Sequence, residues 1–229
     1  GFVDQKDFCR EETLLCVSMT DRRLVAIDLL DGTLSLIANL AKHTGGPCND
    51  CVVCPASGRT WVGNFGWDLF GGEDQNATRL VLVDLDGSDP RPTGGDVLFP
   101  NGGVLANDGE TLVVAESFAK RLTAFDVCAV TGELTNQRVW AELPHIPDGI
   151  AMDHEGCIWV ACPTFDPKDR IGSVSHHSRP SEASCVVCFP MLNWPHRDSR
   201  STELPTPFSA HLLRMFLIAG PQRWVHSRR

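Results

Sequence analysis

The chain has 229 residues, of which 42% are hydrophobic and 21% charged. This balance is typical of a soluble globular protein and excludes the disordered and fibrous classes. The formal net charge of −9 argues against nucleic acid as a partner, because phosphate binding requires a basic surface. No stretch approaches the ~18 continuous apolar residues of a membrane span, and the first ten residues do not resemble a signal peptide. We therefore predict a cytoplasmic protein without a membrane or nucleic-acid partner.

Three short segments share one pattern of strand and turn. Each begins with Arg-Leu, continues with mostly apolar residues, ends in Asp and is followed within a few residues by Gly; the segments are residues 23–28, 79–84 and 121–126. Short apolar runs bounded by turn residues are typical of β-strands. The pattern therefore predicts three equivalent strands.

A second pattern alternates with the first and carries a polar residue at a fixed point. Asn49, Asn101 and Asp148 each precede a predicted strand, a Gly turn and a returning strand, at spacings of 52 and 47 residues. Repeats of ~40–50 residues with about four strands are typical of β-propeller blades. A β-sandwich also alternates strands and turns, but nothing in that fold requires a polar residue at the same point of each unit. We predict an all-β propeller.

The position of these polar residues indicates a function. In a propeller the first strands of the blades line a central channel, so we expect the side chains of Asn49, Asn101 and Asp148 to converge there. Two amides and a carboxylate supply the hard oxygen donors that suit Ca²⁺, Mg²⁺ or Mn²⁺. Asn-Asp, Asn-Gly and Asp-Gly pairs also form turns in many proteins, and on spacing alone that purely structural role stays open.

Longer motifs around these residues resemble the SMP-30/gluconolactonase/luciferin-regenerating-enzyme family. They are GPCNDCVV at 46–53, FPNGGV at 99–104 and PDGIAMDHEGCIWVA at 147–161, and they follow the family order within residues 12–162. The resemblance implies a six-bladed β-propeller, of which this chain contains about three to four blades. It also implies a lactonase that uses one divalent cation, with Ca²⁺ as the first choice and Zn²⁺, Mn²⁺ or Mg²⁺ as alternatives.

The resemblance also implies roles for individual residues. Asn101 and Asp148 are expected as metal ligands, Asp148 also as the general base, and Asn49 as a contact to a small-molecule lactone. Such a set suits hydrolysis of a cyclic ester, since a cation polarises the carbonyl while a carboxylate takes a proton from the attacking water. Phe65 and Trp67 are candidates for apolar walls of the substrate site, and packing between blades is an equally good explanation of Trp67.

Two departures from the family pattern leave an alternative open. The chain has no early Glu-Gly-Pro motif, which in the family supplies a further metal ligand, and Pro47 stands where some members have an Arg that binds sugar lactones. The alternative is an inactive propeller remnant that acts as a binding module or has no function. Neither the identity of the lactone nor the oligomeric state follows from the sequence.

Ten cysteines offer a competing hypothesis. Cys48, Cys51 and Cys54, together with Cys185 and Cys188, have the spacing of zinc or iron–sulfur ligands. However, residues three apart on a strand face opposite sides, so the first three thiols are not expected to converge on one ion. We interpret the cysteines as free thiols in a reducing compartment.

The last quarter of the chain differs in composition from the rest. Residues 1–167 carry a formal charge of −14, whereas residues 168–229 carry +5, hold five of the eight His and are rich in Ser and Pro. We predict a partial propeller domain over residues 1–166 and a basic, irregular or partly helical tail over residues 167–229. Our hypothesis is that the tail comes from a frameshifted or misjoined gene segment.

Overall fold

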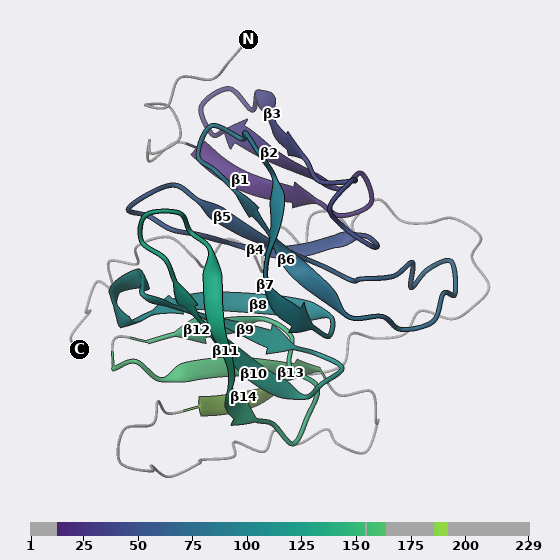
Figure 1. Cartoon of the computed structure of the whole chain (residues 1–229), viewed down its shortest axis with the longest axis vertical. Coiled ribbons are helices and arrows are strands. Elements are labelled where there is room, and N and C mark those ends of the chain that lie inside the picture. Colours follow the sequence, from purple (N-terminus) through teal and green to yellow (C-terminus); the bar gives the residue numbers. More distant parts are fainter. Residues whose placement is uncertain (1–12, 154, 164–185, 192–229) are drawn as a thin grey trace, which may run out of the picture. The chain divides into compact units, whose positions relative to one another are not determined.

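The computed structural model describes residues 13–153, 155–163 and 186–191, all of which belong to one unit within residues 1–193. These residues fold into fourteen β-strands and one short 3-10 turn, η1 (Asn107–Gly109). The strands form four separate sheets that use them in chain order (Figure 1). The predicted all-β class is confirmed.

The sheets are built as follows. The first contains β1 (Thr13–Ser18), β2 (Arg23–Asp28) and β3 (Leu34–Asn39). The second contains β4 (Cys48–Val53), β5 (Thr60–Asn64), β6 (Thr78–Val83) and β7 (Arg91–Val97). The third contains β8 (Pro100–Ala106), β9 (Thr111–Glu116), β10 (Arg121–Val127) and β11 (Leu134–Glu142). The fourth contains β12 (Ile150–Met152), β13 (Ile158–Pro163) and β14 (Val186–Met191).

The sequence repeat is visible in the order of the strands. In the first three sheets, consecutive strands pair antiparallel. Arg79 and Arg121 lie at the start of β6 and β10, the third strands of their sheets, and Arg23 begins β2. The β1–β2–β3 sheet therefore corresponds to the last three strands of a four-stranded unit, and the predicted repeat is confirmed.

The turns explain why glycine recurs at fixed points of the repeat. Gly58, between β4 and β5, has a φ of +69°, in the left-handed region that glycine adopts at little cost. Its N–H donates to the Cys54 carbonyl oxygen at 2.7 Å, which closes the turn. A side chain at this position would also collide with the Leu85 side chain.

One strand of the third sheet shows how the core is shared between neighbouring sheets. All six residues of β9 are buried. Val113 and Ala115 pack with residues of the fourth sheet, whereas Leu112 and Val114 pack with residues of the second. Because successive side chains of a strand point to opposite faces, a sheet covered on both sides requires this uninterrupted apolar run.

An apolar cluster lies between each pair of consecutive sheets. Between the first and second sheets it comprises Leu24, Ala38, Leu40, Cys48, Val62, Val81 and Val83. Between the second and third it comprises Trp61, Leu80, Leu82, Val97, Leu112, Val114, Phe125 and Leu134. Between the third and fourth it comprises Ala106, Val113, Ala115, Leu122, Ala124, Leu143, Ile158, Val160 and Cys162. The stacking of sheets in chain order is the arrangement expected of propeller blades.

A charged network, here called the arginine clamp, joins the second and third sheets. It consists of Arg59, Asp84, Arg91 and Glu133. Arg59 donates to Asp84 at 2.9 Å and to the Val130 carbonyl oxygen at 2.6 Å. Arg91 donates to Asp84 at 2.7 Å and to Glu133 at 2.8 Å. The clamp therefore holds the turn between β10 and β11 against the second sheet.

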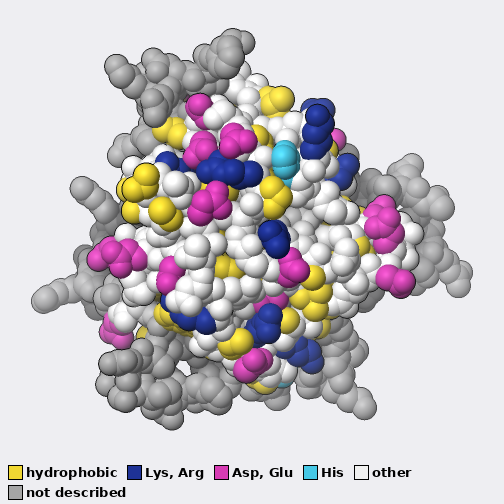
Figure 2. Space-filling view, in the orientation of Figure 1, with side chains coloured by type: hydrophobic (Ala, Val, Ile, Leu, Met, Phe, Trp, Pro, Cys, Tyr) yellow, Lys and Arg dark blue, Asp and Glu magenta, His cyan; other side chains and the backbone are white. Residues whose placement is uncertain are grey.

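The surface mixes both signs of charge. On the face drawn in Figure 2, basic and acidic side chains lie close together, with small groups of hydrophobic side chains between them. Within the described residues there is no helix with the length and hydrophobicity needed to cross a membrane.

One strand falls in the region predicted as a tail. β14 pairs in parallel with β13, while β12 and β13 are antiparallel. The sequence analysis expected no strand there. The remainder of residues 167–229 lies outside the described residues, so the domain boundary at 166 and the character of the tail stay predictions.

Candidate metal and catalytic site

Asn49 lies in a β-bulge near the start of β4. Cys48 pairs with Asn64 and Cys51 pairs with Val62, so two residues of β4, Asn49 and Asp50, stand opposite one residue of β5. A bulge interrupts the regular alternation of side chains and re-aims them. The bulge therefore frees two consecutive polar side chains from the normal pattern of the strand.

The same irregularity recurs near the start of β8. Pro100 pairs with Glu116 and Gly103 pairs with Val114, so Asn101 and Gly102 stand opposite one residue of β9. The repeat thus places an Asn at the first bulged position of both sheets. The sequence pattern identified these Asn residues, but it did not predict the bulges.

Hydrogen bonds connect the first strands of neighbouring sheets. The Asn49 side-chain Nδ2 donates to the Pro100 carbonyl oxygen at 3.1 Å, and the Gly102 N–H donates to the Asp148 carbonyl oxygen at 3.1 Å. Asn49, Asn101 and Asp148 therefore lie on adjacent segments of three consecutive sheets. The structure brings together the three polar residues that the spacing singled out.

Gly102 explains how closely the third and fourth sheets approach each other. A Cβ atom at this position would lie 2.5 Å from the Ile150 nitrogen and 2.8 Å from the Gly149 Cα. Both contacts are with backbone, so any side chain would push the two sheets apart. Glycine is required here because the backbone of the next sheet passes directly beside it.

Ser117, directly after β9, connects Asn101 to the segment that carries Asp148. The Asn101 Nδ2 donates to Ser117 Oγ at 3.2 Å, and Ser117 Oγ donates to the Pro147 carbonyl oxygen at 2.7 Å. Ser117 is buried. Ser117 was not predicted as a site residue, because a single Ser after a strand is not a recognisable sequence motif.

Burial raises the pKa of the Asp148 carboxyl above its usual value, and a hydrogen bond from the Asn101 side chain partly opposes that rise. Burial disfavours the charged form of an acid, whereas a donated hydrogen bond stabilises it. Asp148 is thus a partly buried carboxylate held by an amide, which is a suitable setting for a group that accepts a proton.

Asp50 is a second carboxylate at the same place, and the sequence analysis did not select it. Burial and then the negative charge of Asp148 raise the pKa of Asp50 from 3.8 to about 7. The sequence does contain a sign of its importance. Asp50 directly follows Asn49, whereas Gly follows both Asn101 and Asp148, the equivalent residues of the next two repeats. An acid at a position otherwise occupied by glycine marks this repeat as chemically different.

The donor set fits a hard divalent cation. Within the described residues, the ion pairs with Arg involve other acids, and none involves Asp50 or Asp148. Two neighbouring carboxylates without a cationic side chain repel each other, and a bound cation removes that repulsion. With the side-chain amide of Asn101 hydrogen-bonded to Asp148, these residues carry oxygen donors of the kind that Ca²⁺ prefers.

Phe65 and Trp67 lie in a group of aromatic rings. Phe65 stacks on Phe99 with ring centroids 4.3 Å apart, and Trp67 contacts Phe99 at 5.5 Å and Phe118 at 5.6 Å. Phe65 and Trp67 are only 4% and 3% exposed, whereas Phe118 is 44% exposed. The geometry therefore supports packing as the main role of Trp67. The exposed rings of the group are Phe118 and Phe70, which is 70% exposed and contacts Phe65 at 5.8 Å.

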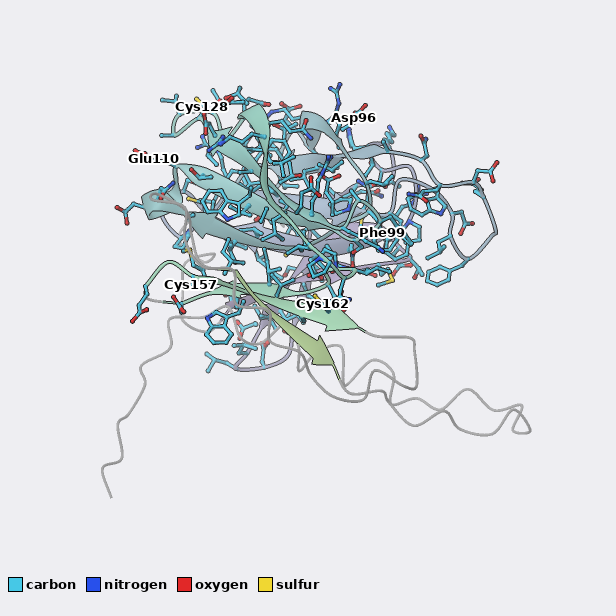
Figure 3. The ribbon with its side chains drawn as sticks, turned by 90° about the horizontal axis from the view of Figure 1, so that it is seen from below. Asp96, Phe99, Glu110, Cys128, Cys157 and Cys162 are labelled. Atoms are coloured by element: carbon cyan, nitrogen blue, oxygen red, sulfur yellow. The ribbon has the colours of Figure 1, made fainter. Side chains whose placement is uncertain are left out.

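This aromatic group belongs to the same end of the sheets as the polar residues. Phe99 precedes the bulge of β8 by two residues, and Phe118 follows Ser117 directly. In Figure 3, Phe99 lies at one end of the third sheet and Glu110 at the other. An apolar wall and a polar cluster thus occur together at the Phe99 end.

The cysteines do not form a metal cluster in the described part of the chain, where no three His, Cys, Asp or Glu side chains could hold an ion. Cys16, Cys48, Cys51, Cys54 and Cys128 are free thiols, as predicted. Burial raises the pKa of Cys48 to about 11 and that of Cys51 to about 12, which keeps both thiols protonated at neutral pH. The side chains of Cys185 and Cys188 lie outside the described residues.

The fold and the site together define a class of protein. Antiparallel sheets stack in chain order, and each of three consecutive sheets presents a polar residue at or just before its first strand. Propeller proteins that bind a ligand near their axis have this organisation.

Comparison with known proteins identifies the family. Residues 6–190 match the family described as the SMP-30/Gluconolactonase/LRE-like region. The chain belongs to this family, as the motifs in the sequence indicated.

The chain is also similar to individual proteins and solved structures. Regucalcin of Danio rerio is 29% identical over 143 residues, which cover 61% of this chain and 47% of that protein. A solved structure of a calcium-binding protein, regucalcin from Agrobacterium tumefaciens, is 25% identical with a TM-score of 0.54, covering 67% of this chain and 50% of the other. A putative gluconolactonase structure, 22% identical with a TM-score of 0.52, covers 66% of this chain and 54% of the other and shares the fold. This chain spans about half the length of the relatives it matches.

Proposed function

We propose that this chain carries the cation and catalytic residues of a lactone hydrolase, the activity for which the gluconolactonases of its family are named. The observation that supports this proposal is the meeting of Asp148, Asp50 and Asn101 at the starts of consecutive sheets, with Asn49 beside them. The substrate is a small-molecule cyclic ester, and the cofactor is one divalent cation. Ca²⁺ is the first candidate because one relative is described as a calcium-binding protein.

The ligands of the cation are Asp148 and Asn101, to which the structure adds Asp50 as a nearby carboxylate. When bound, the cation polarises the lactone carbonyl and offsets the negative charge that develops on its oxygen. Zn²⁺, Mn²⁺ and Mg²⁺ are the alternatives, since carboxylate and amide oxygens also bind these ions.

Asp148 is the general base of the proposed reaction. Its carboxylate takes a proton from the water that attacks the carbonyl carbon and returns it to the ring oxygen as the ester bond breaks, so the product is a hydroxy acid. Asn49 holds the substrate through its side-chain amide. Phe65 and Trp67 support the apolar side of the site from within the aromatic group, whose more exposed members, Phe118 and Phe70, are available for direct contact.

The experiment is a lactonase assay on a panel of γ- and δ-lactones, in a pH-stat, with each of the four cations added in turn. Wild type is compared with Asp148→Asn and with Asp108→Asn, an exposed turn residue in η1 that serves as a control for loss of a carboxylate. We expect cation-dependent hydrolysis by wild type and the control, and none by Asp148→Asn.

The second candidate is a binding module without activity. Pro47 favours it, because some members of the family have at this position an Arg that binds sugar lactones. Cation binding without hydrolysis of any lactone in the panel would support the binding module. Equal hydrolysis by wild type and Asp148→Asn would contradict the proposed mechanism.

A further inference from the structure

The Ser117 hydroxyl has a single proton, and a hydrogen bond within the protein uses it. It donates to the Pro147 carbonyl oxygen at 2.7 Å. A carbonyl oxygen only accepts hydrogen bonds, so no other arrangement of this pair is available. Ser117 is 4% exposed, and solvent therefore competes little for either group.

The hydrogen bond from Ser117 to Pro147 determines which end of the Asn101 amide faces Ser117. With its proton on Pro147, Ser117 Oγ can only accept, and Asn101 Nδ2 donates to it at 3.2 Å. A rotated amide would place Oδ1 against the same oxygen, with two acceptors and no proton between them. Since a lost hydrogen bond leaves a buried polar group unsatisfied, the rotated form is disfavoured.

This orientation turns the amide oxygen away from Ser117 and leaves it free for a ligand. Among the described residues, no hydrogen-bond donor is assigned to the Asn101 Oδ1, whereas Nδ2 is engaged by Ser117. Asn101 also forms a side-chain hydrogen bond with Asp148. An amide held in this way offers its oxygen, the only atom of the group that binds a cation.

We propose that Ser117 is a positioning residue that holds the Asn101 amide with its oxygen toward the cation. The proposal rests on the proposed function, because it assigns Asn101 as a ligand. Groups that orient metal ligands in this way are commonly worth 10–100-fold in metal affinity or activity.

The first measurement follows the Asn101 side-chain NH₂ in ¹⁵N-labelled protein without added metal. The resonance pair is assigned by its loss in Asn101→Ala. We expect Ser117→Ala to shift both proton resonances and Ser117→Thr, which retains a hydroxyl, to preserve them. Ser57→Ala is the matched control, because Ser57 lies in the turn between β4 and β5, far from Asn101 in the strand register. Unchanged Asn101 resonances in Ser117→Ala would overturn the proposal.

The second measurement is the dissociation constant for Ca²⁺, by calorimetry, and for Tb³⁺, by luminescence. We expect Ser117→Ala to bind about tenfold more weakly than wild type, with Ser117→Thr and Ser57→Ala close to wild type. In the Asn101→Ala background, Ser117→Ala should have no further effect, since a residue that acts through Asn101 has nothing left to orient. An equal loss in both backgrounds would identify a general structural defect and overturn the proposal.

These outcomes separate the two hypotheses. If wild type binds neither ion, the proposed cation site is wrong, while the Asn101 resonances still decide whether Ser117 orients the amide. If wild type binds Ca²⁺ and Ser117→Ala binds it equally well, the proposed function stands and the role of Ser117 is rejected.

Discussion

The two ends of the strands differ in how their charges are paired. At the end near Glu110 and Cys128 (Figure 3), the arginine clamp pairs its acids with Arg59 and Arg91. At the end near Phe99, Arg121 pairs with Glu116. Asp50 and Asp148 lie close enough for the charge of Asp148 to raise the pKa of Asp50, and neither is in any of the ion pairs among the described residues.

Paired charges at a sheet interface hold the sheets together. Unpaired buried carboxylates reduce the stability of the fold, so they indicate a place where a ligand supplies the missing charge. The comparison therefore associates the clamp with stability and supports the proposed role of Asp50 and Asp148 in binding a cation.

Replacing Asp148 is expected to have the largest effect on this comparison. We expect Asp148→Asn to lower cation-dependent kcat/KM by roughly 100-fold or more, because a general base typically contributes 10²–10⁴-fold. The thermal midpoint without cation should stay equal or rise, since the change removes one of two repelling carboxylates. Parallel kinetics and calorimetry check both parts, and a large loss of stability would show that Asp148 has a structural role instead.

Replacing Asp50 tests how much the carboxylates without a cationic partner lower the stability of the fold. The pKa of Asp50 is raised in the folded protein to about 7, from 3.8, so the folded state retains a proton that the unfolded state has already lost. Stability contributed by this group is present below pH 4 and is lost as the pH rises toward 7. Asp50→Asn should therefore be about 4 kcal/mol more stable than wild type at pH 8, with little difference at pH 4.

Chemical denaturation of both proteins at pH 4, 6 and 8, without cation, measures this difference. Saturating Ca²⁺ should raise the stability of wild type at pH 8 more than that of Asp50→Asn. A difference between the two proteins that does not depend on pH would show that Asp50 is not a charged group with a raised pKa.

Removing an Arg of the arginine clamp tests whether the clamp stabilises the fold without affecting the proposed cation site. We expect Arg59→Ala to lower the free energy of unfolding by about 1 kcal/mol, because the guanidinium bonds Asp84 and the carbonyl oxygens of Ala129 and Val130. Activity and Ca²⁺ affinity should be unchanged. A loss of Ca²⁺ affinity would show that the two ends are coupled.

We expect the smallest change in stability when an exposed ion pair is removed. Arg79 and Asp96 form an ion pair at 3.2 Å, with side chains 55% and 69% exposed. Because exposed pairs contribute little, Arg79→Ala should change the free energy of unfolding by less than about 0.5 kcal/mol. A cost as large as that of Arg59→Ala would mean that burial does not distinguish the clamp from the surface.

Much of the fold was predictable, because its signals are local. The Arg-Leu runs at residues 23–28, 79–84 and 121–126 are strands with the same place in their sheets. The turn glycines, such as Gly58, follow from backbone conformation alone. β14 was not predicted, because its pairing with β13 joins segments separated by more than twenty residues, and no local pattern reports such a partner.

The candidate site was predictable only in part. Asn49, Asn101 and Asp148 were identified by their repeated position, and the structure brings them onto adjacent segments. Asp50 and Ser117 were not selected, because their importance depends on neighbours distant in sequence. Phe65 and Trp67 were candidates for pocket walls, yet their burial makes them supports of the more exposed Phe118 and Phe70.

The sequence by itself determined the all-β class, the repeat and the family, because strand periodicity, turn chemistry and motif order are properties of short segments. Only the tertiary structure decided how the repeats act on one another. It placed a bulge under each Asn, set Asp50 beside Asp148, and directed the Ser117 proton to Pro147. Charge repulsion and hydrogen-bond direction depend on distances between segments, and those distances exist only once the sheets have packed.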